Sequence, residues 1–405
     1  MLSVEFDQIT MIVRRFMRID AITAGEGKQD YRVRYSGQIY QEDTVAVYDE
    51  VSAQLKPLGY TPLFRKESGS HVIKIVSGVI NPQPSNVWWN GVLFFLTILS
   101  VFYIGLVYAL GGIENPPPTL AGQDLWQFLL PAIPNAIAYT VSLLSILLAH
   151  EFGHYLAGRY HKTAVTLPYF IPFPNIFGTM GAFIQLKEPP KNRRILLDIG
   201  ISGPLAGLVV AIPVLFIGLT LSDMTTIPAT VPAGQVLSIE GNSLLYIAMK
   251  FVTFGQLLPA PASYGDLSPI IYWGRFFFTG QPLPLGGQDV LLHPVAWAGW
   301  AGLLVTALNL VPAGQLDGGH VLYVLLGKRA IKYLPIILIL MLALGFVWPT
   351  WWLWAGLIYF FGRYHAEPLD QITPLDPNRR GVAILGIIIF FLVFTPVPFL
   401  GQGFF

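Results

Sequence analysis

Long apolar runs almost without charge are the feature that most constrains how this chain of 405 residues folds. A helix needs about 20 consecutive apolar residues to cross a lipid bilayer. Runs near that length lie at about 87–111, 135–157, 195–221, 294–312 and 381–400. Two shorter runs, at about 333–348 and 349–362, meet at Pro349 and form either two helices or one bent element. We favour two helices, so the pattern predicts a multi-span α-helical membrane protein with about six or seven transmembrane helices.

The composition agrees with a membrane protein and excludes several kinds of site. Only 12% of the residues are charged, whereas soluble domains carry about 25%. The net charge of +1 provides no basic field for binding nucleic acid. The chain has no cysteine, which excludes disulfides, thiolate metal ligands and a cysteine nucleophile. A metal ion must therefore be held by His, Asp or Glu.

The first 82 residues differ from the rest because their charges are frequent and their apolar residues are dispersed. Alternation and β-favouring residues predict strands at about 31–40, 60–64 and 71–76. A helix is predicted from Asp43 to about Lys56, where apolar residues recur every four positions before a proline and a glycine. We therefore expect a small soluble α+β domain over 1–82 and a transmembrane domain over 83–405.

Lysine and arginine are distributed unequally between the loops. One set of loops contains Arg159, Lys162, Lys187, Lys191, Arg193, Arg194, Lys328, Arg329, Lys332, Arg363, Arg379 and Arg380. In the opposite set, the loop at 111–124 has no Lys or Arg, and 222–293 has only Lys250 and Arg275. By the positive-inside rule, the basic loops and the N-terminal domain face the cytoplasm or an equivalent stroma-like side.

The segment between Thr163 and Pro190 is apolar but is interrupted by prolines and by Gly178 and Gly181. Such a segment is poor helix material, while its Thr, Val, Tyr, Phe and Ile residues favour extended backbone. Non-helical backbone at membrane depth is tolerated only where protein buries it or where it lines a cavity. We therefore expect a membrane-associated β-hairpin or loop here.

The motif His150-Glu151-Phe152-Gly153-His154 lies in a strongly apolar run. Histidines four residues apart on a helix lie about one turn apart, so two imidazoles can hold one metal ion. Arg159 marks the membrane interface, and the two histidines lie about 8 to 14 Å inward of it. Because the motif alone is only moderately specific, a chance match and a structural ion pair are competing interpretations. Its depth favours function, because Glu and His are costly there unless paired or functional.

A third metal ligand is needed, since catalytic zinc takes three protein ligands. The best candidate is Asp317 in the segment NLVPAGQLDGGH at 309–320, on the same side of the membrane as the first motif. Pro312 and Gly314 should break the helix there and allow Asp317 to point inward. A plain surface turn at Asp317 is the alternative. His320 is close enough in sequence to support Asp317, His161 and His365 should be solvated, and His293 should begin a helix.

HEFGH in one apolar run and GQLDGG in a later one resemble the site-2 protease family of intramembrane metalloproteases. The resemblance extends from about Ser142 to Gly327 and includes SGPLAG at 202–207, which is typical of that family. The small domain before the first span and the LDGGH form of the second motif are most similar to the EGY branch of plastids and related prokaryotic proteins. No PDZ-like insertion is recognisable in 222–293.

The resemblance implies a complete site for one Zn²⁺ ion. It assigns His150, His154 and Asp317 as zinc ligands and Glu151 as the acid and base of catalysis. It also implies that Asn309 contacts the substrate or the developing oxyanion. The expected partners are transmembrane protein substrates and the lipid bilayer, and the oligomeric state is not indicated.

The expected function is regulated intramembrane proteolysis, with cleavage toward the cytoplasmic side. The expected location is the inner (plasma) membrane of a prokaryote or a thylakoid-type or plastid-type membrane. Two other classes stay open. A transporter also combines broken helices with intramembrane polar residues, and a catalytically silent scaffold would have the same fold.

Overall fold

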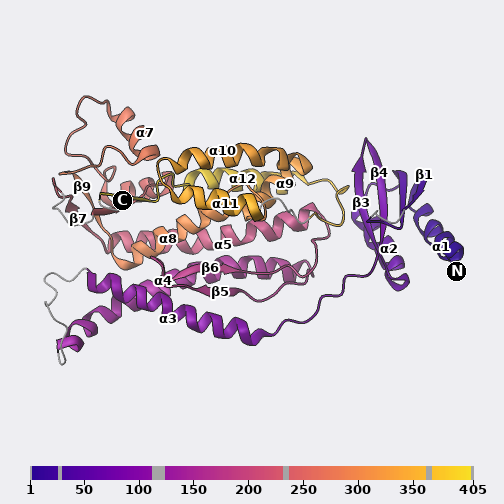
Figure 1. Cartoon of the computed structure of the whole chain (residues 1–405), viewed down its shortest axis with the longest axis horizontal. Coiled ribbons are helices and arrows are strands. Elements are labelled where there is room, and N and C mark those ends of the chain that lie inside the picture. Colours follow the sequence, from indigo (N-terminus) through magenta and orange to yellow (C-terminus); the bar gives the residue numbers. More distant parts are fainter. Residues whose placement is uncertain (1, 26–29, 112–123, 231–236, 362–366, 403–405) are drawn as a thin grey trace.

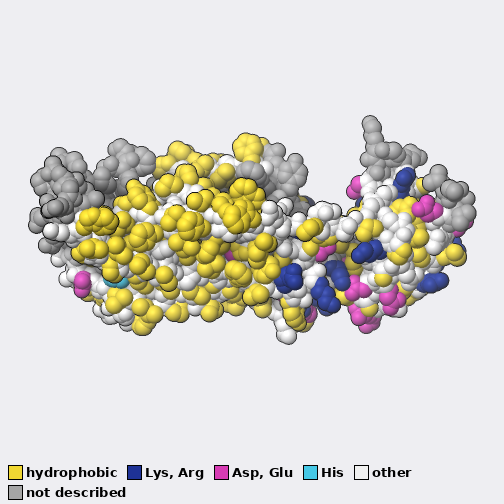
Figure 2. Space-filling model, turned by 90° about the horizontal axis from the view of Figure 1, so that it is seen from below, with side chains coloured by type: hydrophobic (Ala, Val, Ile, Leu, Met, Phe, Trp, Pro, Cys, Tyr) yellow, Lys and Arg dark blue, Asp and Glu magenta, His cyan; other side chains and the backbone are white. Residues whose placement is uncertain are grey.

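The computed structural model of the chain describes residues 2–25, 30–111, 124–230, 237–361 and 367–402. Figure 1 shows an elongated molecule with a small sheet domain at one end and a bundle of helices that run along the long axis. Hydrophobic side chains cover the visible surface of the bundle, whereas charged side chains gather on the sheet domain and at its junction with the bundle (Figure 2). The N-terminal domain and the bundle therefore differ in the side chains that they expose.

The N-terminal domain is an antiparallel sheet packed against helices. Its elements are α1 (Leu2–Arg14), β1 (Met17–Ala24), β2 (Val33–Ile39), α2 (Thr44–Leu55), the 3₁₀ turn η1 (Lys56–Leu58), β3 (Tyr60–Glu67) and β4 (Ser70–Ser77). The sheet order is β1-β2-β4-β3. The predicted helix and three predicted strands are confirmed, while α1 and β1 are additional elements. Val13, Tyr35, Val47, Phe64 and Ile73 are fully buried and belong to one core.

The sheet of this domain continues into a segment from the far end of the sequence. Backbone hydrogen bonds join this segment to the edge of β3 on one side and to the residues before α5 on the other: Phe64 N to Leu369 O, Gln371 N to Phe64 O, Leu369 N to Pro190 O and Asp370 N to Lys191 O. Leu369 and Ile372 also pack against the core of the N-terminal domain. The segment 369–371 therefore ties the N-terminal domain to the helical bundle.

Three described helices are long and apolar enough to cross a membrane, judged by length and composition. They are α3 (Val87–Gly111), α4 (Asp124–Tyr160) and α5 (Arg193–Thr220). All three contain predicted runs, but α4 begins 11 residues before the predicted start at 135. Pro131 and Pro134 lie inside α4 and made an earlier start difficult to predict. Large apolar side chains on the outward faces, such as Leu99 and Tyr103, remain exposed, as expected for contact with lipid.

The remaining helices of the bundle are shorter. They are α8 (Pro294–Asn309), α9 (Asp317–Leu326), the 3₁₀ segment η2 (Gly327–Tyr333), α10 (Leu334–Gly345), α11 (Thr350–Phe361) and α12 (Pro377–Val393). The interpretation of 333–362 as two helices is confirmed, because α10 and α11 are separate helices on either side of Pro349. Helix α8 ends at Asn309, so the run predicted over 294–312 is shorter than expected.

The hairpin expected between Thr163 and Pro190 is present as β5 (Tyr169–Pro172) and β6 (Thr179–Phe183). Its turn contacts α3 and α4, where Tyr108 donates to Ile176 O at 2.5 Å and Tyr139 donates to Phe177 O at 3.1 Å. Gly178 in the turn has φ +81°, and a Cβ there would come within 2.6 Å of the Val101 Cα. The helices therefore cover one side of the turn, where Gly178 and Thr179 are buried, while Ile176 and Met180 remain exposed.

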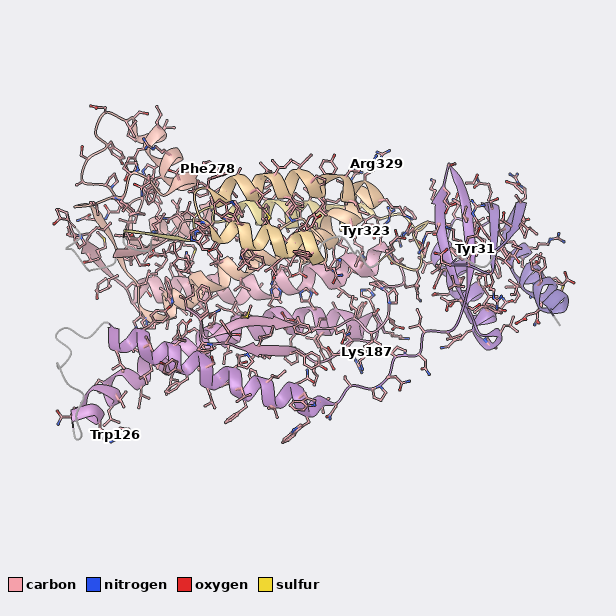
Figure 3. The ribbon with its side chains drawn as sticks, in the orientation of Figure 1. Tyr31, Trp126, Lys187, Phe278, Tyr323 and Arg329 are labelled. Carbon is pink, nitrogen blue, oxygen red and sulfur yellow. The ribbon has the colours of Figure 1, made fainter. Side chains whose placement is uncertain are left out.

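The end of the bundle away from the N-terminal domain is closed by a cap. It consists of β7 (Asp223–Thr226), β8 (Leu237–Glu240), α6 (Leu244–Phe254), α7 (Pro269–Thr279), β9 (Gln288–Leu291) and β10 (Phe399–Gln402). Lys250 is fully buried there, with Nζ 3.7 Å from Glu240 and 3.5 Å from Asp289. Figure 3 places Phe278 and Trp126 toward this end, and Lys187 and Arg329 toward the N-terminal domain.

The basic loops join helix ends near the N-terminal domain, as their grouping predicted (Figure 1). Arg159 lies in the last turn of α4, Arg193 and Arg194 begin α5, and Arg379 lies in the first turn of α12. Arg363 of this group and most of the loop at 111–124 lie outside the described residues. The two ends of the bundle therefore differ in basic charge.

We expect Arg65→Ala to release the segment 369–371 from β3. The Arg65 Nη1 donates to Phe64 O, Pro368 O and Leu369 O at 2.9, 3.1 and 2.8 Å, and it is buried. Its loss removes all three of these hydrogen bonds, although Phe64 O and Leu369 O keep a backbone partner, and should cost about 2–4 kcal/mol. Hydrogen exchange at the Gln371 amide should accelerate, while exchange within β1 and β2 stays slow.

Arg18→Ala is the matched control, since Arg18 pairs with Asp20 on an exposed surface. This variant should leave exchange at Gln371 unchanged. Unchanged exchange at Gln371 in Arg65→Ala would show that the arginine does not hold the segment.

Candidate metal centre

The two histidines of the first motif lie side by side on α4. Because they are four residues apart, their rings occupy successive turns of one helix face. The ring centroids are 4.9 Å apart, and the two Nε2 atoms are 3.2 Å apart. His150 is 3% and His154 is 6% exposed, so both imidazoles are buried within the bundle.

Asp317 joins the histidines from another part of the chain. Helix α8 ends at Asn309, the backbone turns through Gly314 at φ +60°, and Asp317 begins α9. The predicted helix break is therefore confirmed. The Asp317 Oδ2 lies 3.3 Å from His150 Nε2 and 3.4 Å from His154 Nε2. The alternative of a plain surface turn is wrong, because the Asp317 carboxylate points into the bundle.

The two glycines after Asp317 allow this approach. A Cβ on Gly318 would lie 2.0 Å from Leu310 O, and a Cβ on Gly319 would lie 2.4 Å from Gly314 O. Real Cβ atoms essentially never come closer than 3.0 Å to such atoms. The first turn of α9 therefore packs directly on the backbone between the two helices, and only glycine fits at either position.

The three donor atoms have the spacing of a metal site. The Nε2 atoms of His150 and His154 and the Oδ2 of Asp317 are separated by 3.2, 3.3 and 3.4 Å. Ligands that surround zinc tetrahedrally at roughly 2.0–2.1 Å are about 3.3 Å apart. Two imidazoles and one carboxylate also form a donor set suited to catalytic zinc. The described residues therefore fit one zinc ion, with a fourth position left for water or substrate.

Glu151 lies next to this group and has a free acceptor atom. Its side chain is only 5% exposed, and its Oε2 has no hydrogen-bond partner among the described residues. A backbone hydrogen bond from Ile184, the residue that follows β6, reaches the carboxyl group. A buried carboxylate oxygen without a partner is costly and requires an explanation. A water or substrate group between Glu151 and the donor atoms would supply the missing partner.

Helix α5 contributes a contact that the sequence did not reveal. The His154 Nδ1 lies 2.7 Å from the backbone oxygen of Ile199. When Nδ1 donates to this carbonyl, the proton is fixed there and Nε2 keeps its lone pair for a metal ion. Every residue has a backbone carbonyl, so no sequence signal could identify this one.

Asn309 and His320 also lie close to the site. The Asn309 Nδ2 is 3.2 Å from the His150 Nε2, at the end of α8. His320 packs against α5, where a Cβ on Gly200 would lie 3.0 Å from the Cβ of His320. Among the described residues, the metal-binding groups that converge are those of His150, His154 and Asp317, and His320 is not one of them.

The other histidines have structural positions. His293 caps α8 by accepting from the Val295 amide, which confirms that it begins a helix. The expectation that His161 is solvated was wrong, because its Nε2 lies 2.9 Å from an oxygen of Asp198 and the side chain is mostly buried. Asp198 of α5 also binds Arg379 of α12, so this ion-pair cluster links the turn after α4 to two helices. His365 lies outside the described residues.

A family model described as peptidase family M50 matches residues 138–347 of the chain. This stretch contains the two motifs, the hairpin, α5 and the break between α8 and α9. It therefore includes all the residues that form the candidate metal centre.

Curated proteins similar to the chain carry related names. The chain is 29% identical to the probable zinc metalloprotease EGY1, chloroplastic, of Oryza sativa subsp. japonica, over 79% of this chain and 52% of the relative. It is 28% identical to EGY1 of Arabidopsis thaliana, over 79% and 55% of the two chains. It is 27% identical to EGY2 of Arabidopsis thaliana, over 80% and 52%. The chain thus spans about half the length of these relatives, and no solved structure gives a significant match.

We expect His154→Ala and Asp317→Ala to abolish tight zinc binding. Each removes one of three donors, whereas changes in outer residues usually cost about 10–100-fold in metal affinity. The purified chain should bind one zinc ion by elemental analysis, and each variant should retain almost none. His161→Ala removes a buried histidine outside the group and should keep its zinc. Zinc binding that survives in Asp317→Ala would exclude Asp317 as a ligand.

Proposed function

The chain belongs to peptidase family M50, and from this premise we propose that it is an integral-membrane zinc metalloprotease. In this proposal it hydrolyses peptide bonds of membrane proteins within or near the bilayer. One observation carries the proposal: donor atoms of two buried histidines and of Asp317 lie 3.2 to 3.4 Å apart beside the carboxylate of Glu151. The names of the relatives, probable zinc metalloproteases, support the same activity.

The residues of the site have complementary roles in this reaction. Zinc, when bound, supplies a Lewis acid that polarises the scissile carbonyl and makes water more acidic. Glu151 accepts the proton of the attacking water and transfers it to the leaving amine. Its Oε2 suits this role because no described residue occupies it. The Ile199 carbonyl holds the His154 ring in place, so the nitrogen that faces the metal stays deprotonated.

Asn309 is placed to bind the reacting carbonyl. Its Nδ2 lies 3.2 Å from the His150 Nε2 and so at the edge of the donor group. An amide N–H at that position can donate to the oxygen that becomes negatively charged during attack. A zinc ion held by the His150 Nε2 would leave this amide N–H for another acceptor. We therefore assign Asn309 to substrate or oxyanion contact.

We further propose that the chain crosses the membrane six or seven times with the N-terminal domain on the cytoplasmic or stroma-like side. The grouping of basic residues at that end of the bundle supports this orientation. His154 and His150 lie five and nine residues before Arg159, so cleavage is expected in the cytoplasmic half of the bilayer. A plastid-type membrane fits the chloroplast relatives, and a prokaryotic plasma membrane is the other candidate.

The hairpin offers a surface for an unwound substrate. Strands β5 and β6 form a two-stranded sheet, so each has one edge that pairs with no other described strand. A substrate segment that leaves its helix needs partners for its exposed backbone groups, and strand addition supplies them. Ile184 follows β6 directly and contacts Glu151. A substrate strand paired beside β6 would therefore be led toward the catalytic carboxylate.

Glu151→Gln should abolish cleavage and leave zinc bound. The substitution keeps the shape of the side chain but removes the base, so the rate should fall by about 10²–10⁴-fold. Cleavage of a single-span model substrate in detergent or liposomes, measured together with zinc content, checks this expectation. Wild-type cleavage rates in this variant would exclude Glu151 as the base.

The same variant separates protease activity from the other two functions. A transporter needs no general base beside its ligand, so transport would survive in Glu151→Gln. A scaffold would likewise support its cellular role without Glu151. Loss of the cellular role together with loss of cleavage favours the protease.

Gly181→Ala in the hairpin should slow cleavage without removing zinc. Gly181 has φ +98° and open space around it, so alanine meets only backbone strain of about 1–2 kcal/mol. Gly69→Ala is the matched control, because Gly69 has φ +85° and open space in the turn between β3 and β4. If both variants cleave at the wild-type rate, the hairpin does not guide the substrate. Gly178→Pro, which also disturbs the contact with α3, should have a larger effect.

A further inference from the structure

Helix α5 passes close behind the histidines of α4. A Cβ on Gly153, within the first motif, would lie only 2.5 Å from Ser202 O of α5. The two backbones are therefore in direct contact where the motif lies. The imidazoles of α4 lie against α5 at Gly203 and Gly207, whereas Gly200 of the same helix faces His320 of α9.

Gly203 makes the closest approach. A Cβ at this position would lie 2.1 Å from Nε2, 2.4 Å from Cδ2 and 2.5 Å from Cε1 of His154. All three distances are shorter than real Cβ contacts, and Nε2 is the donor atom that His154 offers to the metal ion. The conflict at Gly207 is weaker, since its Cβ would meet Cβ and Nδ1 of His150 at 3.3 Å.

The ring of His154 has little freedom to move aside. Its Nδ1 is held at 2.7 Å by the Ile199 carbonyl, four residues before Gly203 on the same helix. Its Nε2 faces His150 and Asp317. The side chain is also buried, so a displaced ring would have to push into packed neighbours. A methyl group at 203 therefore breaks either the contact with Ile199 or the alignment of Nε2 with the other donors.

We propose that Gly203 is a positioning residue of the metal centre, whose missing side chain leaves the volume that the His154 ring occupies. In this arrangement α5 fixes the ring twice. The Ile199 carbonyl orients it, and the surface of Gly203 sets how close Nε2 comes to α5. The inference rests on the proposed zinc site and adds a third helix to it, beside the helices that carry the ligands.

A different explanation of Gly203 is ordinary close packing of helices. Small residues commonly line helix contacts in membranes, because they let backbones approach. If that is all, alanine at 203 should push α4 and α5 apart and lower stability with or without metal. A positioning role predicts instead that zinc affinity falls far more than the stability of the metal-free protein.

Gly218 offers a matched control on the same helix. A Cβ there would lie 2.1 Å from the backbone N of Ala296, the same separation as at Gly203, but against α8 and away from the histidines. Gly381 of α12 is the open control, since nothing lies within 4 Å of its Cβ position. The alanine therefore clashes with a metal ligand at 203, clashes with the backbone of another helix at 218, and clashes with nothing at 381.

The experiment uses the full chain purified in detergent. Zinc affinity is measured by competition with a chelator, melting temperature is measured with and without zinc, and absorption spectra of the Co²⁺-substituted protein report ligand geometry. Gly203→Ala should weaken zinc binding by about 100-fold or more, since it disturbs a ligand and its outer contact together. It should also lose most of the melting shift that zinc produces and change the Co²⁺ spectrum.

The controls should show different results. Gly218→Ala should lower the melting temperature of the metal-free protein yet keep wild-type zinc affinity in the folded fraction. Gly381→Ala should change neither quantity. Gly207→Ala should weaken zinc binding by less than Gly203→Ala, and it serves as the test if Gly203→Ala does not fold. Wild-type zinc affinity and Co²⁺ spectra in Gly203→Ala overturn the proposal, as does equal loss of affinity in Gly218→Ala.

The outcomes also separate this inference from the proposed function. A wild-type chain that binds no zinc overturns both. If the wild-type chain binds zinc but cleaves no substrate, the proposed protease activity is wrong. The comparison of the glycine variants then still tests the role of Gly203. If the chain is a protease and its Gly203→Ala variant binds zinc normally, only the positioning role of Gly203 is wrong.

Discussion

The burial of a polar ligand group inside an apolar helical bundle is the constraint on which the rest of this structure depends. His150, His154 and Asp317 would each be costly alone at membrane depth, and together they offset that cost by pairing or by holding a metal ion. This requires two distant segments to meet, and their donor atoms lie within 3.4 Å of one another. The break after α8 and the two glycines after Asp317 make this meeting possible.

Much of the site could be predicted because its parts are encoded locally. The spacing of His150 and His154 fixes their common helix face, and Pro312 with Gly314 accounts for the end of α8 before Asp317. The contacts from α5 could not be predicted in this way. Ile199 acts through its backbone carbonyl, and the need for glycine at 203 appears only when the position of the neighbouring ring is known.

The parts of the fold that could be predicted are likewise those encoded by local patterns in the sequence. Long apolar runs gave α3, α4 and α5, whereas β1 lacks a clear alternation because most of its residues are exposed at a sheet edge. The pairing of 369–371 with β3 joins residues about 300 positions apart, and strand register over such distances leaves no local pattern. The burial of His161 could not be predicted for a similar reason, because its partner Asp198 comes from the next helix and is distant in sequence.

The attachment of the N-terminal domain reaches the helices that surround the metal centre. The segment 369–371 lies between β3 and the residues that begin α5, and the chain then continues into α12. Leu197 and Ile201 of α5, Val321 of α9 and Ala383 of α12 share one buried cluster. Close-packed interiors transmit displacement because they contain few voids. The N-terminal domain is therefore linked to the starts of α5 and α12, and α5 in turn contacts His154 of α4 through the Ile199 carbonyl and packs on α9, which carries Asp317.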